Sequence, residues 1–223
     1  MAIRIARGMT ALEDVKRRIA KAMTTAGRSD PPVLIAVSKK QGSDAIRPLL
    51  EAGHRDFGEN RVEEAAEKWP ALRADFPDVR LHMVGQLQSK KAGDAMALFD
   101  AIHSLDRESL LKALVKERDK GATCPDLFVQ VDLQGEEQKG GIAPDALGAF
   151  LGEVREKSAP LKGLMCLPPV DLEASPFFAL LAELGRRHDV NGLSMGMSGD
   201  YEEAVMLGAT HVRVGTALFG ARS

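Results

Sequence analysis

The chain has 223 residues, the size of one (β/α)8 barrel or one large doubly wound domain, and 44% of its residues are hydrophobic. Its 30 Lys and Arg residues against 32 Asp and Glu give a formal charge of −2, which argues against nucleic acid or an acidic membrane surface as the main partner. The N-terminus lacks the apolar run of a secretory signal, and no segment approaches the ~20 apolar residues of a membrane span. We therefore expect one cytoplasmic domain comprising residues 1–223.

Disulfide and metal sites are not predicted. Cys124 and Cys166 lie far apart and outside any Cys-x-x-Cys spacing, so both are expected to be reduced thiols. The histidines are scattered without the spacing of metal ligands. His82 alternates with Val84 on a predicted strand, and it lies either at the mouth of a site or in the core as a hydrogen-bonded residue.

An amphipathic helix is predicted for residues 9–27. Thr10 is the expected N-cap, and Gly27 is the residue at which the helix should end. The apolar residues between them are spaced three and four apart, on one stripe of a helix: Leu12, Val15, Ile19 and Met23.

The rest of the chain alternates short apolar runs with helical patterns. Eight runs in about 220 residues match a single (β/α)8 TIM-type barrel of the α/β class, with an extra N-terminal helix, better than a doubly wound sheet. The strands are expected at 33–37, 55–60, 80–85, 99–104, 127–132, 161–166, 192–195 and 211–215. The helices between them are expected at 43–53, 62–69, 107–120, 144–157, 175–188 and 201–207.

The first strand ends in a hydroxyl and two ammonium groups. Side chains alternate along a strand, so Lys39 shares a face with Val37 and the rest of one apolar set. If that set faces inward, the amine of Lys39 lies at the mouth of an apolar interior, where a lowered pKa lets it attack a carbonyl carbon and form a Schiff base. The alternative is that Ser38, Lys39 and Lys40 are a solvated strand end.

Two loops rich in glycine and hydroxyl groups follow the seventh and eighth predicted strands, at residues 194–200 and 215–220. Small residues let backbone N–H groups approach an anion, and Ser198 and Thr216 can add hydrogen bonds. Barrels often bind phosphate at these two loops. The sequence therefore predicts a phosphate site there.

A Schiff-base lysine and a phosphate site together indicate a ligand with an aldehyde and a phosphate, and pyridoxal 5′-phosphate (PLP) has both. Arg213 lies two residues before Gly215 on the eighth strand, so its side chain can point into the same mouth. A cation facing the pyridine nitrogen would oppose protonation of that nitrogen and weaken the ring as an electron sink. The other reading of Arg213 is an ordinary ion pair.

These residues belong to a longer pattern that resembles the pyridoxal phosphate homeostasis protein family, of the YggS and PROSC type. The pattern spans nearly the whole chain in order, in segments 36–39, 57–60, 82–90, 103–106, 135–141, 163–169, 194–200 and 213–220. The chain departs from it after Lys39, where Lys40-Gln41-Gly42 replaces the usual Thr-Lys-Pro, and at Lys90, which replaces an Asn.

The resemblance implies a barrel similar to the N-terminal domain of alanine racemase. It also implies a regulator or carrier of PLP that influences amino-acid and keto-acid balance without robust catalysis, with PLP-dependent apo-enzymes as possible partners. We expect a monomer. PLP would be held as an aldimine on Lys39, with the phosphate at Ser198, Gly199, Gly215 and Thr216 and the ring near Asn60, Met195 and Arg213.

Two enzyme classes are the alternatives. A PLP-dependent amino-acid racemase needs an acid or base on each face of the cofactor, and the single tyrosine, Tyr201, is expected to begin a helix and pack. A Schiff-base aldolase also uses a barrel lysine, but usually on a later strand than the one before Lys39. The sequence therefore favours a binding protein.

Overall fold

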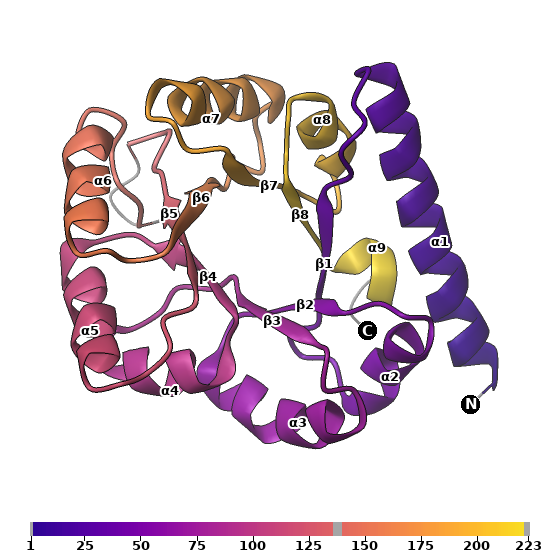
Figure 1. The fold of residues 1–223 in the computed structure, drawn as a ribbon. Coiled ribbons are helices and arrows are strands. Elements are labelled where there is room, and N and C mark those ends of the chain that lie inside the picture. Colours follow the sequence, from indigo (N-terminus) through magenta and orange to yellow (C-terminus); the bar gives the residue numbers. More distant parts are fainter. Residues whose placement is uncertain (1, 136–139, 221–223) are drawn as a thin grey trace.

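Eight parallel strands close into a barrel in the computed structural model, which describes residues 2–135 and 140–220 (Figure 1). Residues 136–139, within one segment of the family pattern, lie outside the described residues. The predicted (β/α)8 fold is confirmed. The strands are β1 (Val33–Val37), β2 (Asp56–Glu59), β3 (Arg80–Met83), β4 (Ala101–Leu105), β5 (Asp126–Gln130), β6 (Leu161–Met165), β7 (Gly192–Met197) and β8 (His211–Val214).

Helices surround the barrel on its outer side (Figure 1). They are α1 (Ala2–Thr25), α2 (Ser43–Glu51), α3 (Val62–Asp75), α4 (Ala92–Leu98), α5 (Glu108–Asp119), α6 (Leu147–Glu156), α7 (Ser175–Arg187), α8 (Tyr201–Met206) and α9 (Thr216–Phe219). A short 3-10 helix, η1 (Ser89–Lys91), precedes α4. Helix α3 continues past the predicted end at residue 69 and through Pro70, since Trp69 and Leu72 on its inner face are buried.

The N-terminal helix α1 packs on α2, α8 and α9, and so covers the place where the first and last strands meet (Figure 1). Its expected apolar stripe is present, with Leu12, Val15 and Ile19 buried. The prediction that Thr10 caps this helix was wrong, because α1 begins at Ala2 and Thr10 lies inside it. The alanine, isoleucine and arginine residues that precede Thr10 allow the helix to continue through it, so the capping preference of threonine is overridden. The helix ends before Gly27, which has a φ of 64°.

Because side chains alternate along each strand, the buried side chains form two separate regions. One set faces outward and packs with the helices in a single large apolar core. The other set faces the barrel axis and includes Ile35 and Phe128, but also His82, His103 and Arg213. Barrel interiors are usually filled by branched apolar residues, so this polar interior is a distinctive feature of the fold.

The pairing of β6 with β7 requires glycine. A Cβ atom on Gly192 would lie 2.2 Å from the Lys162 carbonyl oxygen and 3.0 Å from the Cα of Gly163. Neither neighbour is a flexible side chain, so the strands would have to separate.

We expect Gly192→Ala to lower the free energy of unfolding by about 1 to 3 kcal/mol. The control is Gly152→Ala on α6, where an added Cβ meets nothing within 4 Å. That change should raise the free energy of unfolding by about 0.4 to 1 kcal/mol, because alanine restricts the unfolded chain. Urea unfolding followed by circular dichroism measures both, and equal midpoints for the two variants would contradict the close approach.

Candidate functional site

A cavity of about 570 Å³ opens at the carboxyl ends of β1, β7 and β8, the face at which barrel sites form. Its lining is Val37, Lys39, Gln41, Asn60, Val84, Leu167, Pro168, Val170, Met197, Ser198, Gly199, Arg213, Gly215, Thr216, Phe219 and Gly220. Two cations and several hydroxyl and amide groups contribute to this surface, and no carboxylate side chain does, among the residues the structure describes. The cavity is therefore suited to an anionic ligand.

Lys39 follows β1 directly and enters the cavity beside Val37, two residues earlier on the same face. Its side chain is half-buried, whereas that of Lys40 is exposed. Lys40 adopts a φ of 61°, a conformation that L-residues rarely use, and its backbone N–H donates to the carboxylate of Glu64 on α3. This turn directs consecutive lysines to different surroundings, with only Lys39 in the cavity.

A buried ion pair holds the turn that carries Lys39. Glu59, at the end of β2, is fully buried, and its Oε1 accepts hydrogen bonds from Ser38 Oγ at 2.7 Å and from Trp69 Nε1 at 3.0 Å. The ammonium of Lys68 lies 2.8 Å from the same oxygen. Lys68 also donates to the backbone carbonyls of Ser38 at 2.9 Å and Gln41 at 3.1 Å, one on each side of Lys39. We call Glu59, Lys68, Trp69 and Ser38 the Glu59 clamp.

The carboxyl end of β7 and the turn that follows it form another wall of the cavity. Gly196 has a φ of 92°, and a Cβ there would lie 2.5 Å from the Cβ of Ala204. The β7 register shifts between Ser194 and Met197, so Gly196 lies at a strand irregularity, and β7 continues to Met197 into the segment expected to be a loop. The Met197 N–H donates to Asp200 Oδ1 at 2.5 Å, which fixes the turn.

The segments after β7 and β8 meet through Ser198. Its Oγ accepts hydrogen bonds from the backbone N–H groups of Gly215 at 3.1 Å and Ala217 at 3.3 Å. The hydroxyl hydrogen of Ser198 is left to donate to a ligand. Gly199 and Thr216 lie beside it in the lining, so small residues and hydroxyl groups form this end of the cavity.

Arg213 lies on β8 at the inner end of the cavity and is 5% exposed. Its guanidinium donates to Ser194 Oγ at 2.6 Å and to the carbonyl oxygen of Cys166 at 2.9 Å. Burial lowers the pKa of Arg213 from its usual value. Two of its five N–H groups are used in these bonds, so three are left for other partners.

The structure brings most of the predicted site residues together. Lys39, Asn60, Ser198, Gly199, Arg213, Gly215 and Thr216 all line the cavity. Met195 does not, because it is fully buried in the outer apolar core. The irregularity of β7 at Gly196 instead places Met197 in the lining.

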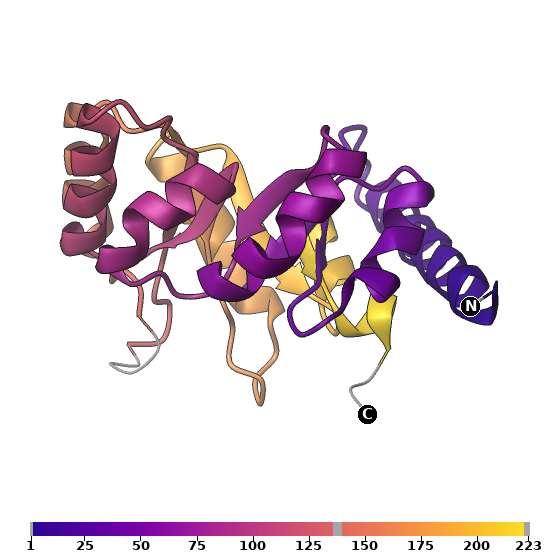
Figure 2. The same cartoon turned by 90° about the horizontal axis from the view of Figure 1, so that it is seen from below.

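Sequence reasoning missed the Glu59 clamp and the apolar rim. Glu59 lies between a buried strand and a turn, and a carboxylate at such a position could have signalled a buried partner. The rim consists of Leu167, Pro168 and Val170, in the loop from β6 to α7 that projects from the same face as α9 (Figure 2). Val170 is 98% exposed, and nothing in its local sequence separates it from other apolar residues.

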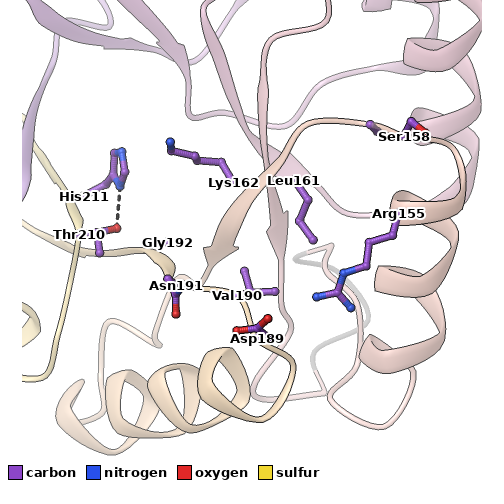
Figure 3. Close-up of a pocket in the computed structure, with 11 residues that line it drawn as sticks. Arg155, Ser158, Leu161, Lys162, Asp189, Val190, Asn191, Gly192, Thr210 and His211 are labelled. Carbon is purple, nitrogen blue, oxygen red and sulfur yellow. Dashed lines mark hydrogen bonds between the residues drawn. The ribbon is translucent and has the colours of Figure 1, made fainter.

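A second cavity, of about 690 Å³, lies at the opposite end of the barrel, at the amino ends of β6, β7 and β8. Figure 3 shows Lys162 extending toward His211, with Arg155 of α6 on the far side. Helices α6 and α7 end at this cavity, and their carbonyl ends carry partial negative charge that offsets the two cations. The cavity at the carboxyl ends of the strands is therefore the better candidate for an anion site.

No group of three or more His, Cys, Asp and Glu among the described residues is arranged to hold a metal ion. Within the same ranges, no helix combines the length and apolar character needed to cross a bilayer.

Comparison with known proteins first defines the class of barrel. The sequence model of the family described as "Alanine racemase, N-terminal domain" matches residues 11–223. Alanine racemase from Acinetobacter baumannii, at 12% identity, has the same fold, with a TM-score of 0.73 over 98% of this chain and 62% of that chain.

More similar proteins define the family. The chain is 40% identical over 215 residues to the "Pyridoxal phosphate homeostasis protein" of Pseudomonas aeruginosa, with 93% of each chain covered. It is 38% identical over 222 residues to the protein of that name from Aquifex aeolicus, with 95% of this chain and 96% of that chain covered. PipY of Synechococcus elongatus, solved with PLP bound, matches at 40% identity and a TM-score of 0.78, over 91% of this chain and 100% of PipY. The chain therefore belongs to the pyridoxal phosphate homeostasis protein family, as its sequence motifs predict.

We expect Lys68→Met to lower the free energy of unfolding by about 3 to 5 kcal/mol, because the buried Glu59 carboxylate would lose its cation. Lys91→Met is the control, since it removes an exposed pair with Glu63 at 2.9 Å and should cost at most about 1 kcal/mol. Urea unfolding measures both, and a loss for Lys68→Met no greater than that of the control would contradict the importance of the Glu59 clamp.

Proposed function

We propose that this protein binds PLP through a Schiff base between the cofactor aldehyde and Lys39, and that it acts in PLP homeostasis and delivery without robust catalysis. The observation that carries the proposal is the lining of the carboxyl-end cavity, with one amine, one guanidinium and no carboxylate side chain among the described residues. Its volume of about 570 Å³ lies in the range of ~300 to 1,000 Å³ usual for small-molecule sites. The family membership supports the same ligand.

The phosphate would lie between the segments that follow β7 and β8. The Ser198 hydroxyl, the backbone at Gly199 and Gly215 and the Thr216 hydroxyl supply hydrogen-bond donors there. An added Cβ at Gly199 meets nothing within 4 Å, so the backbone is open to a ligand at this point. No carboxylate side chain in the lining would repel the phosphate.

The ring would lie between Lys39 and Arg213. A guanidinium facing the pyridine nitrogen donates a hydrogen bond to it and opposes its protonation. Bound PLP would supply an electron sink, and an unprotonated pyridine ring is a weaker electron sink than a protonated one. Asn60 and Met197 are the proposed ring contacts, with Met197 in the place first assigned to Met195.

The alternative is a PLP-dependent amino-acid racemase, which shares the barrel. Proton transfer on both faces of a cofactor requires a second acid or base opposite the lysine. The single tyrosine, Tyr201, is the first residue of α8, is 1% exposed, and lies outside the lining. Together with Arg213 at the ring, this supports binding rather than racemisation.

Delivery of PLP to another protein would take place at the open rim of the same cavity. Leu167 and Val170 are exposed beside the cavity, where a PLP-dependent apo-enzyme could approach Lys39. A closed barrel with its own apolar core has no need of a partner subunit, so we propose that the protein acts as a monomer. We place this activity in the cytoplasm.

We expect Lys39→Ala to lose the long-wavelength absorption band of a lysine-bound PLP and to bind PLP at least tenfold more weakly, a difference of about 1.4 kcal/mol or more. Lys40→Ala is the matched control, because Lys40 is exposed and outside the lining. It should match the wild type in spectrum and affinity. Equal loss in both variants, or in neither, would contradict the assignment.

The same preparations distinguish the racemase. Incubated with L-alanine, the wild type should produce no D-alanine above the rate of free PLP. Racemisation at an ordinary enzymatic rate of about 1 s⁻¹ or faster, abolished in Lys39→Ala, would favour the enzyme.

A further inference from the structure

A line of hydrogen bonds crosses the polar interior of the barrel and ends at Arg213. Arg213 donates to Ser194 Oγ at 2.6 Å, and the same oxygen lies 2.8 Å from His103 Nδ1. His103 Nε2 lies 3.0 Å from His82 Nδ1, and His82 Nε2 lies 3.0 Å from Asp56 Oδ1. The line runs from the carboxyl-end cavity to the amino end of β2.

Only one arrangement of hydrogens satisfies this line with Asp56 ionised and both histidines neutral. The Asp56 carboxylate can only accept, so His82 carries its proton on Nε2 and leaves Nδ1 as an acceptor. His103 must then donate through Nε2, which leaves its own Nδ1 as an acceptor.

Ser194 completes the sequence of donors. Its hydroxyl hydrogen donates to His103 Nδ1, while its oxygen accepts from Arg213. All four bonds therefore point from Arg213 toward Asp56. Hydrogen bonds aligned in one direction polarise one another, and so strengthen the line as a whole.

The line links two charges that are not in contact. Among the described residues, no carboxylate forms an ion pair with Arg213 within 4.0 Å, although the guanidinium is buried. The charge of Asp200, in the turn after β7, acts on it without such a contact. Asp56 is the carboxylate at the far end, where its side chain is 26% exposed. Burial raises the pKa of Asp56, but the hydrogen bond from His82 and nearby positive charge, including that of Arg80, together hold the pKa below its usual value.

The surroundings of His103 disfavour a charge on its ring. Burial, followed by the electrostatic effect of His82, His211 and Arg213, holds the pKa of His103 well below its usual value. Phe128 stacks on the His103 ring at a centroid distance of 4.2 Å and excludes water from that side. The pKa of His211 is lowered to about 3, mainly by burial. Three charged side chains also act on His103 or His211: Arg80 from β3, Lys162 from β6 and Arg213 from β8.

We propose that Asp56, His82, His103 and Ser194 form a positioning chain for Arg213, which fixes the orientation of its guanidinium and so the direction of its remaining N–H groups. This inference rests on the proposed function, since it assigns those N–H groups to the PLP ring. None of the four residues lines the cavity, and they reach it only through the bond from Arg213 to Ser194. The His103 to Ser194 bond spans the barrel from β4 to β7.

A proton added to His82 would reverse the two hydrogen bonds that His103 makes, to His82 and to Ser194. If His82 became an imidazolium, both of its nitrogens would donate, and His103 would have to donate to Ser194. Ser194 Oγ would then receive donors from both Arg213 and His103, and its own hydrogen would lose its acceptor. The chain therefore works in its neutral form.

The first test is NMR of the ligand-free protein with ¹⁵N-labelled histidine at pH 7. Two-bond ¹H–¹⁵N spectra distinguish the two neutral tautomers from the imidazolium. We expect both His82 and His103 to carry hydrogen on Nε2 alone. Hydrogen on Nδ1 of either ring, or an imidazolium, would overturn the direction of the chain.

The second test is Asp56→Asn, with Asp126→Asn as its matched control. Both aspartates are the first residues of their strands, and Asp126 pairs only loosely with Arg80, at 3.5 Å. Asp56→Asn should mix the tautomers of His103 and weaken PLP binding by roughly 2- to 30-fold. The control should change neither.

The two readouts separate the inference from the proposed function. If Asp56→Asn leaves the His103 tautomer and the PLP affinity at wild-type values, the positioning chain is wrong even though PLP binds. If the wild type takes up no PLP, the proposed function fails, and the part of the inference that concerns the PLP ring fails with it. The tautomers then still decide whether the four bonds run from Arg213 to Asp56.

Discussion

The pairing of β1 with β8 is the interaction on which the site depends. It closes the barrel with Val33 opposite His211 and Ile35 opposite Arg213. The first strand thereby brings Lys39 to the segment that follows the last strand, although the two are separated by most of the sequence. Helix α1 packs over this seam on the outside, so the added N-terminal helix protects the one junction that joins the two ends of the fold.

The barrel has two different cores, one outside the strands and one inside them. The outer one is apolar and accounts for most of the burial, as expected for strands covered by helices. The inner one carries an arginine and a group of histidines, which would be costly without partners. Aligned hydrogen bonds to Asp56 offset that cost, and the Glu59 clamp does the same for the turn that holds Lys39. Polar groups are therefore concentrated where a ligand has to be positioned.

The sequence was sufficient for the fold and for most of the cavity. A short apolar run ending at Lys39, and glycine-rich segments after the last two strands, are local patterns that a barrel places at one face. The position of Met195 could not be read in this way, because a glycine with positive φ at position 196 interrupts the alternation of β7. The convergence of His82 and His103 depends on which strands become neighbours, and spacing along the chain does not show it.

The central claim is that Lys39 is the residue that reacts with PLP. Reduction of the PLP-loaded protein with borohydride, followed by mass spectrometry of its peptides, tests this directly, since reduction makes a Schiff base permanent at the lysine that formed it. The account predicts a pyridoxyl group on Lys39 and none on the adjacent Lys40. A label on another lysine, or a protein that carries no label after loading, would contradict it.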